Sequence, residues 1–543
     1  MTGNRTRLPA SGATFGDIRG LTRRDLLLRG GILVAAAGSP AFLAACDVAG
    51  DATGSQSMKK QLAIRLVSDI TTLDPAQMTS TVEDAVMLCV GENLMTYESG
   101  STDLVPELAE ELTSSKDGKT HKFRLKKGMQ FHGDFGEVTA EDVKFSFERI
   151  AGLTKPKIES AYQGDWAALE GVEVTGTYTG VVHLKEPFAP LMLTTIPGNA
   201  GIIISRAAYE KLGEDFATQP IGSGPYEFVR WRRGESIDLK RFAQWGGAGR
   251  KWGGMPPMEQ IAFKPIAEDS AADVAVESGE VDFGPIAHIS VDRFDQDQQF
   301  SVSKQTTLDY GWVGFNVTDP KLSDVRVRRA LRSALDVDSM IEAAFNGKTT
   351  RADALIAPDM PVGHWSEAPR YERDVEGAKA LLAESGVQDL ALDMDIQEEP
   401  GSRTIAEIVQ SNLSDIGVKV RIRMNAEGEI YENMQSLQMF YMSFSNQADP
   451  SWATVWFTTD QIGEWNMMSW SNKEFDSLHA NALTELNVER RHQMYLRMQE
   501  LMDEDAVAAW VMYRTHHYAH PGDLDPTLLT PRFGKYRAWT FEV

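Results

Sequence analysis

The residues best suited to hold a small molecule lie in the stretch MSFSNQADPSWATVWF, from Met442 to Phe457. Asn446 and Gln447 supply amide hydrogen-bond donors and acceptors, and Asp449 supplies a carboxylate. Trp452 offers a flat apolar ring that can stack on a sugar, a ring or a peptide plane. Two simpler interpretations stay open: Asp449 as a turn residue, and the tryptophan as part of the core.

Other candidate binding residues are scattered along the chain. EWNMMSW contributes Trp465 and Asn466, and AYQGDW contributes Tyr162 and Trp166. Asn316 belongs to GWVGFNV, a strand-like segment in which alternate residues share a face. Its side chain either faces a ligand or anchors a hinge by bonding to backbone groups.

Residues arranged for catalysis are missing from the sequence. It contains no GxSxG elbow, HExxH motif, CxxC pair or phosphate-binding loop, and its ten histidines are scattered without ligand spacing. We therefore expect no enzyme activity, no metal and no cofactor. A hydrolase remains a minor alternative.

The charge balance argues against nucleic-acid binding. The 543 residues carry a formal net charge of −24, and lysines and arginines form no stripe that would neutralise phosphates. Because 42% of the residues are hydrophobic, the chain can bury large cores.

The N-terminal region has the pattern of an export signal. Arginines precede an apolar run, residues 30–45, that is too short and too broken to span a bilayer core of about 30 Å. The paired arginines of TRRDLL resemble a twin-arginine signal, and LAAC, residues 43–46, resembles a lipobox. We expect a signal peptide over 1–45, a lipid on Cys46 and a flexible tether over 46–60.

The rest of the chain shows α/β patterning. Strand-like runs such as VKVRIRM alternate with amphipathic helical runs such as VRVRRALRSAL. Thr139 and Asp142 are expected to cap one helix, with Asp142 in the place usually taken by Glu. Gly222 and Gly224, in PIGSGPY, are expected to permit unusual backbone angles in a rigid turn between lobes. Cys89 lies in the apolar stretch AVMLCV and is expected in the core.

A series of collinear segments resembles the extracytoplasmic solute-binding proteins of peptide-type ABC importers, the family that includes oligopeptide and dipeptide binders. The resemblance is densest at FRLKKGMQFHGDFGEVTAEDVKFSFERI and spans residues 72–483. The other matching segments are TLDPA, LVPELA, VVHLKEPFAPLM, PIGSGPYEF, ESGEVD, GWVGFNV, YERDVEGAKALLAESGV, IGVKVRIRM and NKEFDSLHANAL.

This resemblance implies a two-lobed α/β periplasmic-binding-protein fold, with a hinge and an extra domain inserted in the first lobe. The lobes would close over a solute and shield it from water. The implied ranges are 61–100, 221–312 and 511–543 for lobe one, 101–220 for the inserted domain, and 313–510 for lobe two.

The resemblance also implies the partners: a peptide or a peptide-like, opine-like solute, and the permease of an ABC importer. Peptide-binding members carry an aspartate for the ligand's amino group where this chain has Asn446, so a free peptide amino terminus loses a charged partner here. The expected protein is a monomeric periplasmic lipoprotein at the membrane surface. A docking or chaperone-like lipoprotein on the same fold is the alternative.

Overall fold

The computed structural model describes residues 60–246, 254–426, 429–528 and 536–542. The predicted signal peptide, Cys46 and nearly all of the predicted tether lie outside the described residues. None of the helices in the described ranges combines the length and the apolar character that a bilayer crossing requires.

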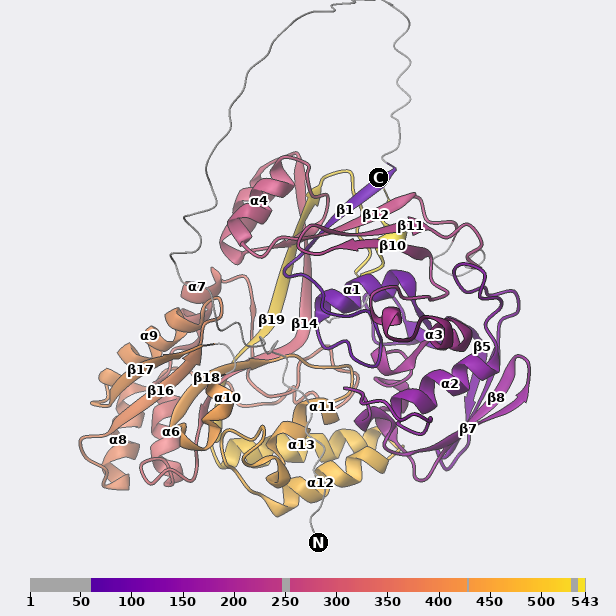
Figure 1. The fold of residues 1–543 in the computed structure, drawn as a ribbon. Coiled ribbons are helices and arrows are strands. Elements are labelled where there is room, and N and C mark those ends of the chain that lie inside the picture. The colour runs from indigo at the N-terminus through magenta and orange to yellow at the C-terminus, as the bar shows by residue number, and fades with distance from the viewer. Residues whose placement is uncertain (1–59, 247–253, 427–428, 529–535, 543) are drawn as a thin grey trace, which may run out of the picture.

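The first lobe is built on a mixed four-stranded sheet (Figure 1). Its strands come from distant parts of the sequence, with β1 parallel to β12. Cys89 lies fully buried in its core, as predicted, and burial raises the pKa of the thiol. In spatial order the strands are β1 (Gln61–Leu66), β12 (Gln260–Pro265), β11 (Ser236–Arg241) and β10 (Tyr226–Arg232), with helices α1 (Thr81–Val90) and α3 (Arg206–Leu212) beside them.

A smaller domain that begins after residue 100 and ends before β10 carries its own antiparallel sheet. The predicted helix cap is confirmed, since the backbone N–H of Thr139 donates to Oδ2 of Asp142 at 3.0 Å. A buried ion pair between Arg149 and Asp74 ties this domain to the first lobe. In spatial order the strands of this sheet are β5 (Ala109–Ser114), β6 (Thr120–Leu125), β8 (Thr179–Leu184) and β7 (Leu169–Gly176), and the sheet packs on α2 (Ala140–Ile150). Two short strand pairs complete this part of the chain: β2 (Glu92–Asn93) with β9 (Ile202–Ile203), and β3 (Met95–Tyr97) with β4 (Leu104–Pro106).

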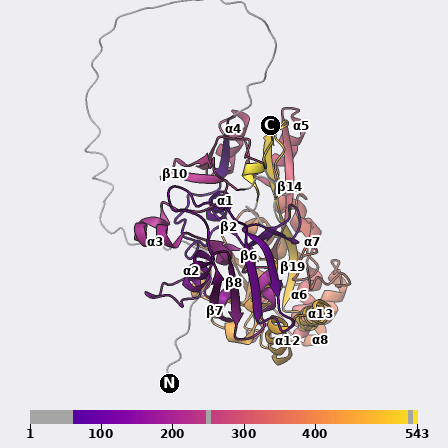
Figure 2. The same cartoon turned by 90° about the vertical axis from the view of Figure 1, so that its right-hand side faces the viewer.

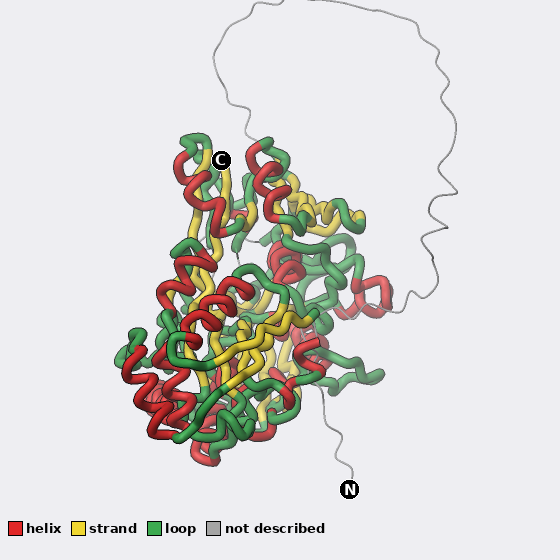
Figure 3. The backbone as a smooth tube through the Cα atoms, turned by 90° about the vertical axis from the view of Figure 1, so that its left-hand side faces the viewer, coloured by secondary structure: helices red, strands yellow, loops and turns green. Residues whose placement is uncertain are grey.

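The second lobe surrounds the lower part of a seven-stranded sheet (Figure 3). Its strands are β13 (Gly284–Ile286), β19 (Ala508–Pro521), β14 (Phe300–Phe315), β18 (Met439–Phe444), β16 (Ala391–Gln397) and β17 (Lys419–Asn425), with β15 (Thr350–Arg351) paired to β19. One core lies against α6 (Val325–Ala334), α7 (Val337–Phe345), α8 (Val375–Ser385) and α9 (Ser402–Ser414). A second core lies against α10 (Glu429–Glu432), α11 (Ser451–Thr454), α12 (Lys473–Thr484) and α13 (Val488–Glu504), while α4 (Asp269–Glu277) and α5 (Val291–Gln296) flank the upper end of the sheet.

Two long strands, β14 and β19, are shared by both lobes (Figure 1). They pair antiparallel from Phe300 opposite Pro521 to Gly314 opposite Ala508, with a bulge in β14 between Thr306 and Tyr310 and a second register shift between Gly311 and Trp312. The expected domain limits at residues 312 and 510 fall inside these strands. The lobes are therefore joined by paired strands, and the bulge is the larger of two points where the pairing is locally disrupted.

The two halves also touch on both sides of the shared strands. On one side the turn at Gly118 of the inserted domain meets Leu486 of the second lobe, and the short 3-10 helix Ala189–Met192 packs on α12 (Figure 2). On the other side Lys348 of the second lobe pairs with Asp292 of the first at 2.5 Å. The structure thus has the lobes in contact, as in a closed binding protein.

The predicted reason for the glycines of PIGSGPY is wrong. Neither Gly222 nor Gly224 has a positive φ. A Cβ atom on Gly222 would lie 2.0 Å from the carbonyl oxygen of Val90, and the backbone N–H of Gly224 donates to that oxygen at 2.9 Å. Close approach to the end of α1 requires these glycines.

Removing the apolar contact at Leu486 is expected to favour the open state. Leu486 is 43% exposed and rests on Gly118, so Leu486→Ala removes a contact that exists only when the lobes meet. We expect small-angle scattering of the solute-free protein to show a larger radius of gyration for this variant. Val488→Ala, at a side chain 67% exposed, serves as the control; equal radii for both variants would contradict the contact's role.

Acid is expected to weaken the fold through two histidines between the lobes. The ring of His288 lies 5.5 Å from that of His517 and 5.4 Å from that of Phe345. Burial lowers the pKa of both histidines from 6.5 to about 4, and neighbouring cations add to the shift. Because the unfolded chain takes up these protons first, the free energy of unfolding should fall as pH drops from about 6.5 to about 4.

Urea unfolding across this pH range measures the effect. The variant with both His288→Gln and His517→Gln should show a shallower fall than the native protein. An unchanged slope would show that these two rings do not contribute.

Candidate solute-binding site

The candidate loop lies at the carboxyl ends of parallel strands. Strand β16 runs parallel to both β17 and β18, so all three end at one edge of the sheet. The segment Ser445–Asp449 follows β18 at that edge, and the backbone N–H of Asn446 donates to Oδ1 of Asp309 in the hinge bulge at 2.9 Å. Crevices at the carboxyl ends of strands are where α/β proteins commonly bind ligands.

Asn446 is almost completely buried in this loop, with 1% of its surface exposed. Its Oδ1 accepts the backbone N–H of Gln447 at 2.9 Å. Its Nδ2 has no hydrogen-bond partner in the described part of the structure. A buried donor without a partner destabilises the fold by about 1–3 kcal/mol. A hydrogen-bond acceptor on a solute that contacts Nδ2 would remove this cost.

Asp449 is held by an ion pair inside the second lobe. Its carboxylate contacts both Nη atoms of Arg491, on α13, at 2.6 and 2.7 Å, and accepts bonds from the backbone N–H and hydroxyl of Ser451. The side chain has no exposed surface. This arrangement favours the turn interpretation of Asp449, and Gln447 beside it is also buried.

Aromatic rings gather next to this loop. Trp452 and Trp465 both approach Trp456, with ring centroids 5.5 and 5.4 Å apart, and all three pack on one core with Tyr97 of the first lobe. We call this the aromatic cluster; its members are Tyr431, Phe444, Trp452, Trp456 and Trp465. Tyr97 thus reaches the same core from the other lobe.

Sequence analysis did not single out Tyr97, Tyr431 or Phe444. Phe444 ends a strand, Tyr431 lies on a one-turn helix and Tyr97 is in another lobe. No spacing rule relates the three positions, and only the tertiary fold brings them together.

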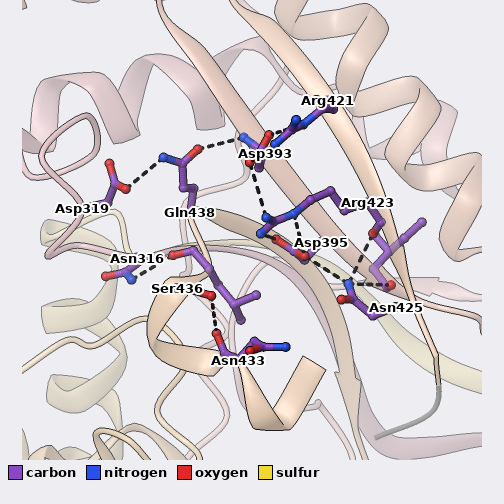
Figure 4. A network of polar contacts seen from close by, with 12 residues as sticks. Asn316, Asp319, Asp393, Asp395, Arg421, Arg423, Asn425, Asn433, Ser436 and Gln438 are labelled. Atoms are coloured by element: carbon purple, nitrogen blue, oxygen red, sulfur yellow. Dashed lines mark hydrogen bonds and ion pairs between the residues drawn. The ribbon is translucent and has the colours of Figure 1, made fainter. Parts of the chain in front are cut away.

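Asn466 and Asn316 are occupied by backbone groups. The Nδ2 of Asn466 donates to the carbonyls of Phe457, Thr458 and Trp470. The Nδ2 of Asn316 donates to the carbonyl of Leu437 at 2.8 Å, beside the polar network drawn in Figure 4. Of the two roles expected for Asn316, this contact fits the one in which its side chain bonds to backbone groups.

The network beside Asn316 reinforces the outer edge of the second lobe (Figure 4). Asp393 pairs with Arg421 and Asp395 with Arg423, directly across the two parallel strands. Gln438 accepts the backbone N–H of Asp393 at 2.8 Å. These contacts hold β16, β17 and β18 in the register that sets the position of the candidate loop.

Tyr162 and Trp166 lie in the inserted domain. Trp166 is 2% exposed, donates to the carbonyl of Ala200 at 2.9 Å and packs on Phe147. The hydroxyl of Tyr162 accepts from Asn199 at 2.7 Å. Both pack in or against the core of the inserted domain, so the structure does not bring them to the candidate loop. Among the described residues, no group of three histidine, cysteine or acidic side chains could hold a metal.

Residues 103–466 match a known family, described as bacterial extracellular solute-binding proteins, family 5 Middle. The chain belongs to this family. The resemblance noted from the sequence and the two-lobed α/β fold class are thereby confirmed, and the family is one of extracellular binding proteins.

Individual relatives cover most of the chain. The dipeptide-binding protein of Escherichia coli strain K12 is 27% identical over 473 residues, which cover 81% of this chain and 87% of that protein. The glutathione-binding protein GsiB of Shigella flexneri is 23% identical over 490 residues, covering 87% and 91%. The structure of DppA from Helicobacter pylori in complex with peptide STSA has a TM-score of 0.75 at 22% identity, covering 90% of this chain and 98% of that chain.

Breaking the ion pair of Asp449 is expected to destabilise the second lobe. Arg491→Met leaves a buried carboxylate uncompensated, at a cost of about 3–5 kcal/mol. Urea unfolding measures this loss. Arg497→Met, at an exposed arginine paired with surface glutamates, should cost less than about 1 kcal/mol. Equal stability of the two variants would contradict the structural role of the pair.

Proposed function

We propose that this protein is the solute-binding component of an ABC importer. It captures a peptide-like or opine-like solute between its lobes and delivers the solute unaltered to the membrane permease. The observation that carries the proposal is the buried amide donor of Asn446, which has no partner among the described residues and follows a strand that ends in the aromatic cluster. The core on which that cluster packs is also contacted by Tyr97 of the other lobe. Such a site binds by stacking and hydrogen bonding.

The relatives support the solute class. A dipeptide-binding protein and a glutathione-binding protein match this chain over most of their length. Their names indicate short peptides and peptide derivatives, and this size suits a site between two lobes that close.

The proposal includes no chemical conversion of the solute. At the candidate loop the hydroxyl of Ser451 donates to the carboxylate of Asp449, but that carboxylate is fully buried and already paired with Arg491. Binding, closure and release are sufficient for the proposed task.

We also propose that the protein works outside the cytoplasm as a monomer, held at the membrane by a lipid on Cys46. The export-signal pattern and the LAAC stretch of the sequence support this step. Mass spectrometry of Cys46 from native membranes tests it, because lipidation adds a defined mass to an N-terminal cysteine.

Solute capture is tested by native mass spectrometry of the purified protein, followed by thermal-shift screening of dipeptides, tripeptides, glutathione and opines. A bound solute stabilises the fold by RT ln(1 + [L]/Kd), about 2.7 kcal/mol at one hundred times Kd. We expect at least one peptide-like solute to raise the melting temperature. If none of these classes does so, the proposal is wrong.

The aromatic cluster should carry part of the affinity. Trp465→Ala removes a half-buried ring that contacts Tyr431 and Trp456, and we expect it to weaken binding of that solute by about tenfold. Trp231→Ala, on β10 of the first lobe and far along the chain from the cluster, is the control and should bind normally. Isothermal titration calorimetry measures the dissociation constant of both variants. Unchanged affinity in Trp465→Ala would show that the aromatic cluster does not contribute to the binding site.

A further inference from the structure

We infer that the solute presents a hydrogen-bond acceptor, and no free ammonium group, to the loop Ser445–Asp449, as an N-acylated peptide does. This inference rests on the proposed function and specifies the solute class of the same site. The contacts of Asn446 carry it.

The orientation of the Asn446 amide is fixed by its own loop. Oδ1 faces the backbone N–H of Gln447 at 2.9 Å, so a flipped amide would set two donors against each other. The free atom is therefore Nδ2, which can donate and cannot accept. Because the side chain is 1% exposed, water in the bulk does not satisfy that donor.

A second unpartnered donor lies in the adjoining core. Nε1 of Trp312 has no hydrogen-bond partner among the described residues, and the ring of Trp312 lies 4.9 Å from that of Phe444 in the aromatic cluster. The unpartnered atoms of Asn446 and Trp312 are thus both N–H groups. A solute that enters here gains most by bringing oxygen acceptors.

The carboxylates that contact the loop and the strand before it are engaged. Asp309 accepts the backbone N–H of Asn446, and Asp449 is paired with Arg491. Glu399 accepts the hydroxyl of Ser443 at 3.0 Å and lies 3.8 Å from Arg514. An ammonium group at Nδ2 of Asn446 would set two hydrogen-bond donors against each other.

These contacts select for the amino end of a peptide-like solute. A free amino terminus placed at Nδ2 of Asn446 would bring donors against a donor, so neither group would be satisfied, which is costly in a buried site. An acyl group converts that end into an amide whose carbonyl oxygen can accept from Nδ2. The site therefore favours N-acylated over free peptides.

A matched library tests this preference. An equimolar mixture of tripeptides, each present in a free and an N-acetylated form, is incubated with the full-length protein, and retained peptides are identified by native mass spectrometry. We expect the acetylated forms to be enriched by about tenfold or more. Enrichment of the free forms, or equal retention, would overturn the inference while leaving the proposed function intact.

Variants at Asn446 locate the preference. Asn446→Asp replaces the donor with a carboxylate and should reverse the ratio toward free peptides, whereas Asn446→Ala should abolish it. Asn412→Asp makes the same chemical change on α9, where the side chain accepts only the backbone N–H of Asp336, and should bind as the native protein does.

Two further results have a defined meaning. If the native protein prefers acetylated peptides and Asn446→Ala retains that preference, the inference about Asn446 is wrong. If the native protein retains neither form, while thermal shift detects no peptide-like solute, the proposed function itself fails.

Discussion

The structure depends on the pairing of β14 with β19. These strands belong to both lobes, so any movement of one lobe relative to the other must bend or twist a hydrogen-bonded ribbon. The bulge between Thr306 and Tyr310 is the larger of two places where that ribbon departs from regular pairing. Asp309 in the bulge also holds the backbone of Asn446, so the place where the ribbon can deform is bonded directly to the candidate loop.

This connection gives a physical route from solute to lobe closure. A solute that bonds to Nδ2 of Asn446 stabilises the arrangement in which the loop, the bulge and the aromatic cluster are packed together. Contacts on the two sides of the ribbon set the balance that the solute must shift: Leu486 on Gly118 on one side, and Lys348 with Asp292 on the other. How far a solute shifts the balance depends on its differential affinity for the closed state.

Much of the fold was predictable from local patterns. The cap formed by Thr139 and Asp142, the buried Cys89 and the α/β alternation follow from short-range rules, and the ordered segments indicated the family. The shared strands were harder to predict, because the sequence of β14 changes from polar to apolar along its length and resembles two separate segments. Gly222 was predicted for the wrong reason, since its close neighbour, Val90, is far away in the sequence.

The candidate site was only partly visible in the sequence. The loop at Asn446 and two tryptophans of the cluster, Trp452 and Trp465, were found from residue types, but side-chain chemistry alone could not show which polar groups were already occupied. Asp449 has its partner, Arg491, on a distant helix, and Asn466 is surrounded by carbonyls. Whether a polar side chain already has its hydrogen-bond partners depends on tertiary contacts. Asn446 differs from the other polar candidates because its Nδ2 has no partner among the described residues.

The most direct test measures the distance between the lobes with and without solute. Spin labels at Lys116 of the inserted domain and Glu489 of the second lobe, both exposed, would report on the rim where Gly118 meets Leu486. Pulsed electron–electron double resonance measures the distance between the two labels. We expect a broad distribution of longer distances for the empty protein. We expect one narrow, short distance once a solute that raises the melting temperature is bound. The same distribution in both conditions would contradict capture by closure of the lobes.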